Sequence, residues 1–402
     1  MKAVILAAGQ GMRMRPLTYN RPKPMLPVAN KPILEHLLLE CIPAGIKEFV
    51  FIVGYKDRSI MDYFADGFNW EVQICYKIQE TATGTAEAVN LARDVVGGNF
   101  IVLNGDGILQ KKDIEKLANS EFTTITVKEV EDVTGLGVVG VRNGRVSGIL
   151  EKPEFAASKL ANTGAYFFTD TIFSAIDHTG KSQRGQLEIT RSLEILINEG
   201  FEVGYQPIDF WLTMSYPWDL LNANELLMSG LGTVCKGTIE SGVNIQGPCA
   251  IGFNTRIRSG SYIVGPVVIG DNCDIGPNCY VRGSTAIGDG CHIGASVEIK
   301  NSIIMRKTKI PHLSYIGDSV IGENCNLGAG TKIANLRFDH KDIRIGQNNT
   351  GRRKLGAIIG DNVQTGINVS INSGTMIGHD SFIWPGAVVQ GEIEPGSVVR
   401  SN

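Results

Sequence analysis

The chain has 402 residues, of which 43% are hydrophobic and 20% charged, and its formal net charge at pH 7 is -3. Such a chain is long enough for two or three domains with substantial cores. Its charge gives no electrostatic reason to expect nucleic acid or a membrane surface as a partner, and no apolar run approaches the roughly 20 residues that span a bilayer.

Short apolar runs alternate with helical stretches through the first half of the chain. Buried parallel strands are predicted at residues 3–6, 48–53 and 100–103, with helices at 33–41 and 85–93 between them. This alternation predicts a doubly wound, Rossmann-like α/β sheet, whose ligands lie beyond the carboxyl ends of its strands. The first run is too short for a signal peptide, so we expect a cytoplasmic protein.

A loop rich in small and basic residues follows the first predicted strand. It contains Ala8, Gly9, Gly11 and Arg13. Small residues let backbone N–H groups approach phosphate oxygens, and the arginine adds positive charge. Further along the same loop, prolines on both sides hold Lys23 rigidly.

An acidic residue follows the strand predicted at 100–103. This strand ends in Asn104-Gly105-Asp106, and a carboxylate at a strand end is suited to Mg²⁺. Together with the phosphate-binding loop, Asp106 favours a site for a nucleoside triphosphate and its metal.

The second half of the chain repeats every six residues. Apolar residues occupy positions 239, 245, 251, 257, 263, 269, 275, 281, 287, 293 and 299. This period fits neither a 3.6-residue helix nor an alternating strand. It predicts a left-handed parallel β-helix of hexapeptide repeats, with three hexads to a coil and the β-branched residue pointing inward. We therefore divide the chain into domains at 1–228 and 229–402.

The six-residue repeat is interrupted in two ways. Its phase slips by one residue after Ile299 and again after Ile316, on either side of a segment that contains His312. The repeat disappears over residues 335–356, which form a basic loop. Loops that interrupt a rigid solenoid are where binding chemistry tends to lie.

Eight cysteines show neither a Cys-x-x-Cys pair nor a metal-ligand spacing. Cys273 and Cys291 are one 18-residue coil apart and are expected to stack on adjacent coils. In a reducing cytosol, buried thiols that fill the core are favoured over a disulfide.

The first half resembles the sugar-1-phosphate nucleotidylyltransferases. The resemblance lies in Leu6 to Arg13, in Pro16-Leu17-Thr18 and in Lys23-Pro24-Met25. It implies that a sugar-1-phosphate oxygen attacks the α-phosphorus of UTP or dTTP and releases pyrophosphate. The implied roles are nucleotide binding by Ala8, Gly9, Gly11, Gln79, Gly84 and Thr85, charge stabilisation by Arg13 and Lys23, Mg²⁺ binding by Asp106, and sugar-phosphate binding by Glu151, Lys152, Asn162, Gly164 and Glu188.

One position departs from this family. Thr213 stands where the family carries an Asp that serves as a second Mg²⁺ ligand. A neutral hydroxyl should weaken metal binding. Asp209 and Asp219 are the candidates to replace the missing carboxylate.

The second half resembles the acetyltransferase half of bifunctional enzymes that make UDP-N-acetylglucosamine, and the archaeal members in particular. The matching segments are residues 298–300, 311–318, 326–330, 335–339 and 351–356. The resemblance covers nearly the whole chain. It implies acetyl transfer from acetyl-CoA to the amine of glucosamine-1-phosphate, with His312 as the general base.

Three further sets of residues follow from this resemblance. The sugar phosphate is held by Arg282 and Lys300, the sugar is oriented by Tyr315, Asn326 and Asn335, and phosphates of CoA or of the sugar are reached by Lys341, Arg353 and Lys354. β-Helices of this kind usually assemble as trimers with sites between subunits, so we expect a homotrimer.

Three alternatives stay open at this stage. The β-helix is only structural in a hexose-1-phosphate uridylyl- or thymidylyltransferase. The first domain is regulatory in an acetyltransferase. The whole chain is a non-catalytic sensor of sugar nucleotides. The choices between UTP and dTTP, and between glucosamine and galactosamine, also stay open.

Overall fold

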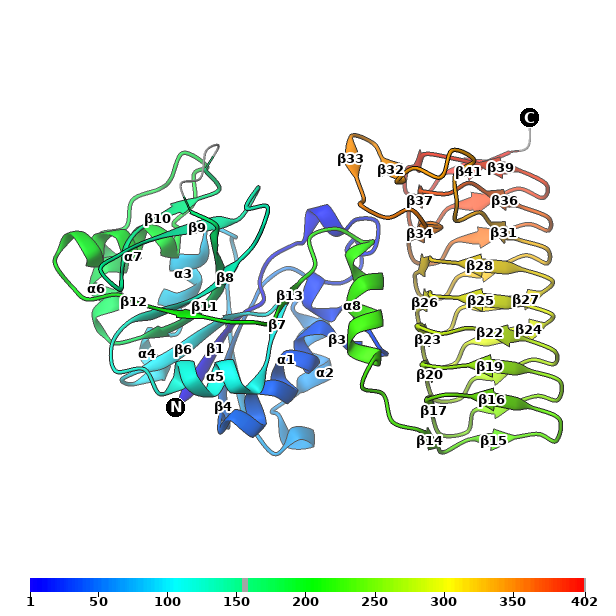
Figure 1. Cartoon of the computed structure of the whole chain (residues 1–402), viewed down its shortest axis with the longest axis horizontal. Helices are drawn as coiled ribbons and strands as arrows, with labels where there is room; N and C mark the ends of the chain where they lie inside the picture. The colour runs from blue at the N-terminus through cyan, green and yellow to red at the C-terminus, as the bar shows by residue number, and fades with distance from the viewer. Residues whose placement is uncertain (154–157, 401–402) are drawn as a thin grey trace. The chain divides into compact units, whose positions relative to one another are not determined.

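The structure is a computed structural model that describes residues 1–153 and 158–400 (Figure 1). It divides into two compact units, which are described separately. The first unit comprises residues 1–10, 21–25 and 33–213, and the second comprises 11–20, 26–32 and 214–402.

The first unit is built on one sheet. The strands follow the order β10 (Arg145–Glu151), β9 (Gly137–Arg142), β11 (Leu160–Phe168), β6 (Phe100–Asn104), β1 (Lys2–Leu6), β4 (Glu48–Val53) and β5 (Gln73–Ile78), and β8 (Thr124–Glu129) joins β11 to β12 (Gly204–Pro207). The strands β6, β1, β4 and β5 are parallel, and β11 is antiparallel to β6. The prediction of a Rossmann-like α/β sheet is therefore confirmed.

Helices accompany this sheet. They are α1 (Ile33–Cys41), α2 (Arg58–Phe64), α3 (Thr85–Asn90), α4 (Arg93–Val96), α5 (Lys111–Ala118), α6 (Thr171–Asp177) and α7 (Ile189–Asn198). The helix predicted over 85–93 is divided, because the N–H of Ala92 donates to Val89 in a tight turn between α3 and α4. Alternate residues of β1 pack into two different buried clusters, so apolar side chains cover both faces of the sheet.

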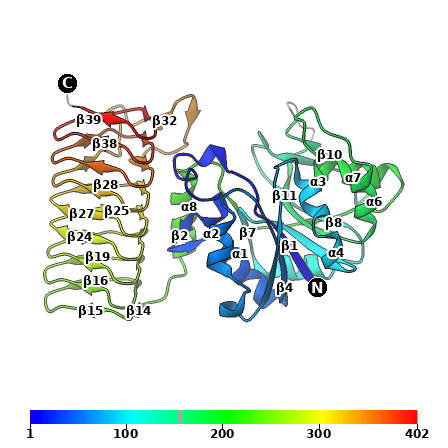
Figure 2. The ribbon, with the colours of Figure 1, turned by 180° about the vertical axis from the view of Figure 1, so that it is seen from behind.

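The second unit is mainly a β-helix of stacked coils, each of which gives one short strand to each of three parallel sheets (Figures 1 and 2). Face 1 contains β14 (Val234–Cys235), β17 (Cys249–Ile251), β20 (Val267–Ile269), β23 (Thr285–Ile287), β26 (Ile303–Ile304), β29 (Val320–Ile321), β34 (Ala357–Ile359), β37 (Thr375–Ile377) and β40 (Glu392–Ile393). Face 2 contains β15 (Thr238–Ile239), β18 (Arg256–Ile257), β21 (Asp274–Ile275), β24 (His292–Ala295), β27 (Lys309–His312), β30 (Asn326–Leu327), β35 (Gln364–Thr365), β38 (Phe382–Ile383) and β41 (Val398–Val399). Face 3 contains β16 (Asn244–Gln246), β19 (Tyr262–Val264), β22 (Tyr280–Val281), β25 (Glu298–Lys300), β28 (Tyr315–Gly317), β31 (Lys332–Ile333), β36 (Ser370–Ile371) and β39 (Val388–Val389).

The repeated apolar residues form the core of this β-helix. Ile257, Ile275, Ile293 and Ile310 pair in register from coil to coil and are completely buried. The phase slips are coils of 17 rather than 18 residues, since Ile287 pairs with residue 304 and that residue pairs with 321. The predicted hexapeptide β-helix is confirmed.

The basic loop is an insertion between two coils. β29 pairs directly with β34, so the residues between these two coils leave the regular repeat. Part of this insertion is a hairpin of β32 (Arg344–Ile345) and β33 (Asn348–Asn349), which projects from the coil (Figure 1). Helix α8 (Asp219–Met228) also belongs to the second unit.

The cysteines of the β-helix core are free thiols. Cys273 and Cys291 are buried, and each donates from its sulfur to a backbone carbonyl. Burial raises the pKa of the Cys273 thiol to about 11. The preference for packed thiols over a disulfide is confirmed.

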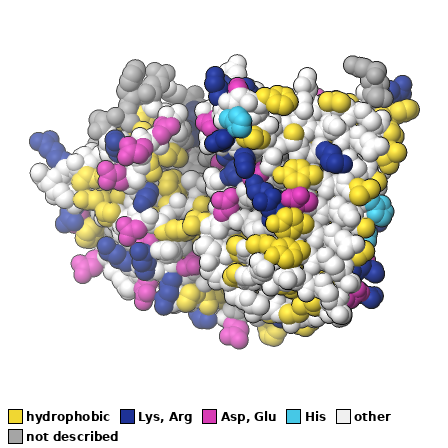
Figure 3. All heavy atoms as spheres, turned by 45° about the vertical axis from the view of Figure 1, so that its right-hand side comes forward, with side chains coloured by type: hydrophobic (Ala, Val, Ile, Leu, Met, Phe, Trp, Pro, Cys, Tyr) yellow, Lys and Arg dark blue, Asp and Glu magenta, His cyan; other side chains and the backbone are white. Residues whose placement is uncertain are grey.

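Across residues 1–153 and 158–400, no helix has the length and apolar character needed to cross a membrane. On the face shown in Figure 3, lysine and arginine side chains are interspersed with aspartate and glutamate, and the apolar patches are small.

Candidate functional site

A cavity of about 290 Å³ opens at the carboxyl ends of β1 and β6 in the first unit. Its lining includes seven residues that the sequence singles out, namely Ala8, Gly9, Lys23, Gln79, Gly84, Thr85 and Asp106. They come from four separate stretches of the chain, which the parallel strand order brings to one edge of the sheet.

The Gln79 side chain is held in a fixed orientation in this cavity. Its amide nitrogen donates to the carbonyl of Gly84 (3.0 Å) and to the Glu87 carboxylate (2.9 Å), and only 7% of the residue is exposed. A side chain at Gly84 would place its Cβ 2.1 Å from the carbonyl oxygen of Leu187, and Gly84 has a φ of +141°. Glycine is therefore required where this wall of the cavity meets the segment before α7.

A salt bridge joins the two charged residues of the cavity. Lys23 Nζ lies 2.6 Å from Asp106 Oδ2, and the lysine is buried. Strand β13 (Trp211–Thr213) runs antiparallel to β7 (Gly107–Leu109), and Thr213 pairs with Gly107, the residue after Asp106. The departure at Thr213 therefore lies directly beside the candidate metal ligand.

These residues fit Mg²⁺ only as part of its coordination shell. No group of three or more His, Cys, Asp or Glu side chains that could hold a metal occurs in the described residues. Mg²⁺ commonly binds one or two carboxylates and takes its other oxygens from water and substrate phosphates. Asp106 can supply one such carboxylate.

The two candidate replacements for the missing carboxylate have other partners. Asp209 is exposed and pairs with Lys112 at 3.3 Å. Asp219, in the second unit, accepts from the N–H groups of Ser215 (2.7 Å) and Tyr216 (2.8 Å) at the start of α8. A metal-binding role for either residue stays a prediction.

The predicted sugar-phosphate residues form two local groups in the first unit. Glu151 and Glu188 share one arginine, since Arg184 Nη2 lies 3.2 Å and 2.5 Å from their respective carboxylates. Asn162 accepts from the N–H of Gly164 (3.0 Å).

Two further observations complete these groups. A Cβ at Gly164 would lie 1.9 Å from the side chain of Asn104, which lines the cavity. Lys152, after Glu151, has a positive φ of 49°. Arg184 is absent from the sequence prediction, because a lone arginine in a loop gives no sign that it joins two distant glutamates.

Glu151 provides a test of this arrangement through pH. Burial raises the pKa of the Glu151 carboxyl, with Arg184 opposing the change and Glu188 adding to it. Between the unfolded and folded pKa values the folded state binds more protons, so stability should fall as pH rises through this window. Glu151→Gln removes the ionisation, and its stability relative to wild type should therefore increase as pH rises from the ordinary pKa of a glutamate carboxyl through the raised pKa of the folded state.

Urea unfolding at a series of pH values measures this difference. Glu121→Gln, at an exposed position, is the matched control and should show a flat difference. A difference for Glu151→Gln that is flat or falls with pH would contradict the assignment.

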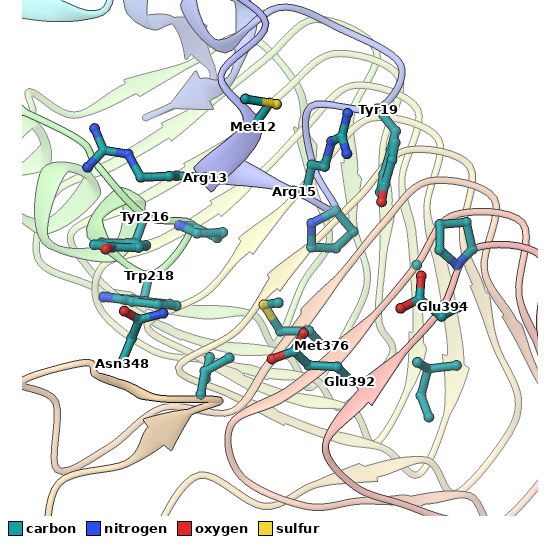
Figure 4. A pocket seen from close by; sticks show the side chains of 16 residues that line it. Met12, Arg13, Arg15, Tyr19, Tyr216, Trp218, Asn348, Met376, Glu392 and Glu394 are labelled. Atoms are coloured by element: carbon teal, nitrogen blue, oxygen red, sulfur yellow. The ribbon is translucent and has the colours of Figure 1, made fainter. Parts of the chain in front are cut away.

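Arg13 and Gly11 belong to the second unit. Arg13 lies in a short 3-10 helix, η1 (Met12–Met14), whose first flanking residue, Gly11, is in the left-handed conformation. The Arg13 guanidinium lies 5.7 Å from the centre of the Tyr216 ring (Figure 4).

In the β-helix, a buried carboxylate organises the predicted acceptor residues. Asp318 is 2% exposed and accepts from Lys300 (3.2 Å), Asn301 (2.8 Å) and Asn335 (2.5 Å). Asn335 also donates to the Tyr315 hydroxyl (3.2 Å). We call Lys300, Asn301, Tyr315, Asp318 and Asn335 the acceptor network.

A glycine makes room for this network. A Cβ at Gly317 would lie 2.6 Å from the Tyr315 hydroxyl and 2.7 Å from the Asn335 amide. Burial raises the pKa of the Tyr315 hydroxyl, and the nearby Asp318 raises it further. The tyrosine therefore stays a neutral hydrogen-bonding group.

Basic residues on neighbouring coils of face 3 extend the network. Tyr280 pairs with Glu298, which places Arg282 and Lys300 on successive coils at the same end of the face. Arg282 Nη1 lies 3.0 Å from Glu298. Two cations on adjacent coils can grip one phosphate.

His312 and Asn326 lie apart from each other along face 2. His312 ends β27 with an exposed side chain, and Tyr315 begins β28 just after the next corner. Asn326 pairs with Lys309 at the other end of β27. His312 therefore lies just before strand β28, which begins with Tyr315 of the acceptor network. Asn326 does not join them within one chain.

The insertion loop starts and ends at the acceptor network. Leu355 N–H donates to the backbone carbonyl of Asn335, and Gly356 N–H donates to the backbone carbonyl of Asp318. Lys341, Arg353 and Lys354 are exposed on this loop, and Arg353 also contacts His340. Arg352 instead pairs with Glu225 of α8 at 3.6 Å.

Asp318 is the main residue that sequence reasoning did not assign to the site. It belongs to an Ile-Gly-Asp trio that recurs with Asp271 and Asp289, which are turn residues. Those two follow strands of face 1, whereas Asp318 follows a strand of face 3. The position of the trio within the repeat could have distinguished Asp318 from the two turn residues, whereas the three residues of the trio could not.

We predict that Asp318→Asn lowers the free energy of unfolding by about 1–3 kcal/mol. The new amide leaves Lys300 without a counter-charge, and its own N–H groups would face the donors that now bind the carboxylate. Thermal unfolding at equal protein concentration measures the change. Asp289→Asn, in the exposed version of the same trio, should stay within about 0.5 kcal/mol of wild type. Equal losses in both variants would contradict the organising role of Asp318.

The fold and these two sites define the class of protein. A Rossmann-like sheet carries a glycine-containing loop and a Lys–Asp pair beside a cavity, and a left-handed parallel β-helix carries a histidine beside a buried polar network. This combination is that of a transferase with two separate sites.

Comparisons with known proteins agree with this class. A family model described as nucleotidyl transferase matches residues 2–229, and one described as the GMPPB C-terminal domain matches residues 263–382. A protein named bifunctional protein GlmU from Methanococcus maripaludis is 40% identical over 99% of this chain and 97% of its own length. A Sulfurisphaera tokodaii protein named bifunctional sugar-1-phosphate nucleotidylyltransferase/acetyltransferase is 38% identical over the full length of both chains.

A solved structure matches part of the chain. A putative glucose-1-phosphate thymidylyltransferase from Bacillus anthracis matches 56% of this chain and 94% of its own, with 29% identity and a TM-score of 0.52. The chain belongs to the nucleotidyl transferase family and, over its whole length, to the archaeal bifunctional nucleotidylyltransferase/acetyltransferase enzymes.

Proposed function

We propose that this chain acetylates glucosamine-1-phosphate with acetyl-CoA and then transfers a uridylyl group from UTP to N-acetylglucosamine-1-phosphate, releasing pyrophosphate. The observation that carries the proposal is the similarity over the full chain to bifunctional relatives. The two separate polar sites support it, since each reaction needs its own.

In the first unit, binding and charge carry the nucleotidyl step. Gln79 and the backbone at Gly84 would hold the pyrimidine, and the loop at Ala8 and Gly9 would bind phosphate oxygens. Lys23 would exchange Asp106 for the transferring phosphate. The charge-stabilising role that the resemblance implies for Arg13 stays a prediction, because this residue belongs to the second unit. Such reactions depend on positioning and electrostatics rather than on covalent chemistry by the protein.

Mg²⁺ is proposed as the cofactor of this step, held by Asp106 together with substrate phosphates. When bound, the ion neutralises the charge that develops on the phosphates. Glu151, Lys152, Asn162, Gly164 and Glu188 are proposed to hold the sugar phosphate in this unit.

In the β-helix, His312 would remove the proton from the amine as its nitrogen attacks the thioester carbonyl of acetyl-CoA. The carbon–sulfur bond breaks, and the proton passes to the leaving CoA sulfur. Arg282 and Lys300 would hold the sugar phosphate, and Tyr315 and Asn335 the sugar. Lys341, Arg353 and Lys354 would bind phosphates of CoA or of the sugar.

We also propose a cytoplasmic homotrimer with functional halves at 1–228 and 229–402. Assembly would explain the position of Asn326, which lies apart from His312 within one chain and would serve the site of a neighbouring subunit.

Product analysis by mass spectrometry tests the function. The mixture contains the purified protein, glucosamine-1-phosphate, acetyl-CoA, UTP, dTTP and Mg²⁺. A nucleotide-linked N-acetylhexosamine is expected, and its base identifies the nucleotide. N-acetylglucosamine-1-phosphate without any nucleotide sugar would overturn the nucleotidyl half, and nucleotide sugar without acetylation would overturn the other half.

A further inference from the structure

The second unit contains a cavity of about 360 Å³ whose lining shares only Arg13 with the residues proposed for the two reactions (Figure 4). Its walls come from the loop at residues 11–20, the turn at 216–218, the hairpin β32–β33 and the last coils of the β-helix. All of these segments belong to the same compact unit.

The loop that forms one wall is fastened to the β-helix. The Asn20 amide donates to the Asp361 carboxylate (3.1 Å). Next to it, the Tyr19 ring packs edge-on against the ring of His379, with centroids 4.8 Å apart. The wall is therefore held in place before any ligand arrives.

Two arginines of this loop line the cavity. The guanidinium of Arg15 lies 4.6 Å from the centre of the Tyr19 ring, and that of Arg13 lies 5.7 Å from the centre of the Tyr216 ring. Within residues 1–153 and 158–400, their recorded contacts are with these rings rather than with carboxylates. Arginines held over aromatic rings with free N–H groups are suited to binding a phosphate.

Two carboxylates face the cavity from the other side. Glu392 and Glu394 come from the last coils of the β-helix and line the same cavity as the arginines (Figure 4). Both residues are exposed, and neither carboxylate has a recorded hydrogen bond or ion pair in the described part of the chain. Such a pair accepts hydrogen bonds from an ammonium group or from hydroxyls.

The aromatic residues exclude a nucleobase as the occupant of this wall. The Tyr216 and Trp218 rings are stacked with centroids 4.7 Å apart and planes 5° apart, and Trp218 is buried. Arg13 lies over Tyr216, so that neither face of this ring is open for a base to stack. The rings position an arginine instead.

The opposed charges define the chemistry of the ligand. A phosphate suits the arginine wall, an ammonium group suits the glutamate wall, and the volume lies within the range of small-molecule pockets. We propose that this cavity is a second binding site for a hexosamine phosphate in its unacetylated, zwitterionic form. The choice of this ligand rests on the proposed acetyltransferase function, which makes glucosamine-1-phosphate a substrate of the chain.

Acetylation should release the ligand. It converts the ammonium group into a neutral amide, which the two carboxylates no longer attract. The cavity would therefore distinguish the substrate of acetyl transfer from its product, and it would do so beside Arg13, to which a role in nucleotidyl transfer is assigned.

The test is calorimetric titration of full-length protein with glucosamine-1-phosphate, without acetyl-CoA or UTP. The double variant Glu392→Gln/Glu394→Gln should bind one molecule per chain fewer than wild type, or bind it at least about tenfold more weakly, while retaining its acetyl-transfer rate. The control Glu121→Gln/Glu199→Gln makes the same charge change at exposed positions outside the cavity and should bind like wild type. N-acetylglucosamine-1-phosphate should bind both double variants equally.

The possible outcomes separate the two proposals. Equal stoichiometry and affinity in wild type and in the Glu392/Glu394 variant would overturn the cavity site. One site in wild type and none in this variant would support the cavity but count against an acceptor site in the β-helix. If the Glu392/Glu394 variant still binds the ligand, but at one site fewer per chain than wild type, both the cavity site and the acceptor site are supported.

Discussion

His312→Ala should reduce acetyl transfer from acetyl-CoA to glucosamine-1-phosphate by about 100-fold or more, the usual contribution of a general base. The side chain is exposed at the end of β27 and pairs across the ladder with the small Ala295, so its removal opens no cavity in the core. The fold and the release of pyrophosphate should therefore be unchanged. Release of free CoA thiol measures the first reaction, and pyrophosphate release from UTP with added N-acetylglucosamine-1-phosphate measures the second in the same preparation.

A second histidine on face 2 provides the matched control. His292 lies on the preceding coil, where it pairs with Lys309 and lies 3.4 Å from Asp274. His292→Ala removes the same ring from the same face and should leave acetyl transfer within about twofold of wild type. Equal rates of CoA release in wild type and His312→Ala would show that another group takes the proton.

The β-helix could be predicted from sequence because its energy is local and periodic. Each coil buries one apolar side chain per face against its equivalent on the next coil, so the sequence itself repeats. Each phase slip corresponds to a coil that is one residue shorter. Residues 287, 304 and 321 still pair in register across these shorter coils.

The cavity of the first unit was predictable for a different reason. Small residues and charges at the ends of buried parallel strands necessarily meet at one edge of the sheet. The sequence could not indicate that Lys23 and Asp106 pair at 2.6 Å, because that distance depends on how two loops pack. Arg184 was missed on the same grounds, since its partners Glu151 and Glu188 meet only in the folded chain.

Two residues show where local pattern misleads. Asp318 resembles an ordinary turn aspartate and is in fact buried at the centre of three donor side chains. Arg13 is four residues from Gly9 in the sequence, yet it packs with the second unit. A sequence motif predicts which type of residue stands at a position. It does not predict which side chains that residue will contact in the folded chain.

The second large effect concerns the departure at Thr213. Thr213→Asp should raise Mg²⁺-dependent pyrophosphate release by about tenfold, which corresponds to about 1.4 kcal/mol of the barrier. The ladder pairs this position with Gly107, so that the new carboxylate would lie beside Asp106 and complete a two-carboxylate set. Pyrophosphate release at increasing Mg²⁺ concentration measures the change.

Mg²⁺ binding provides an independent readout of the same substitution. Two neighbouring carboxylates repel each other without a metal, so Thr213→Asp should unfold at a lower temperature than wild type in EDTA and gain more from added Mg²⁺. Thr213→Asn is the control, since it has nearly the shape of aspartate without the charge, and it should show neither effect. If Thr213→Asp gains Mg²⁺ stabilisation without faster pyrophosphate release, metal binding is not what limits the first unit.

The result for Thr213→Asp also decides between two functions of the first unit. Pyrophosphate release by wild type could be near background and be restored by Thr213→Asp. The threonine would then have turned the first unit into a binding module beside an active acetyltransferase. Substantial release in wild type would mean that Asp106, water and substrate phosphates suffice to hold the ion, as the single-carboxylate geometry allows. In that case Lys23, which lies beside Asp106, adds a positive charge at the transferring phosphate next to an ion held by one carboxylate.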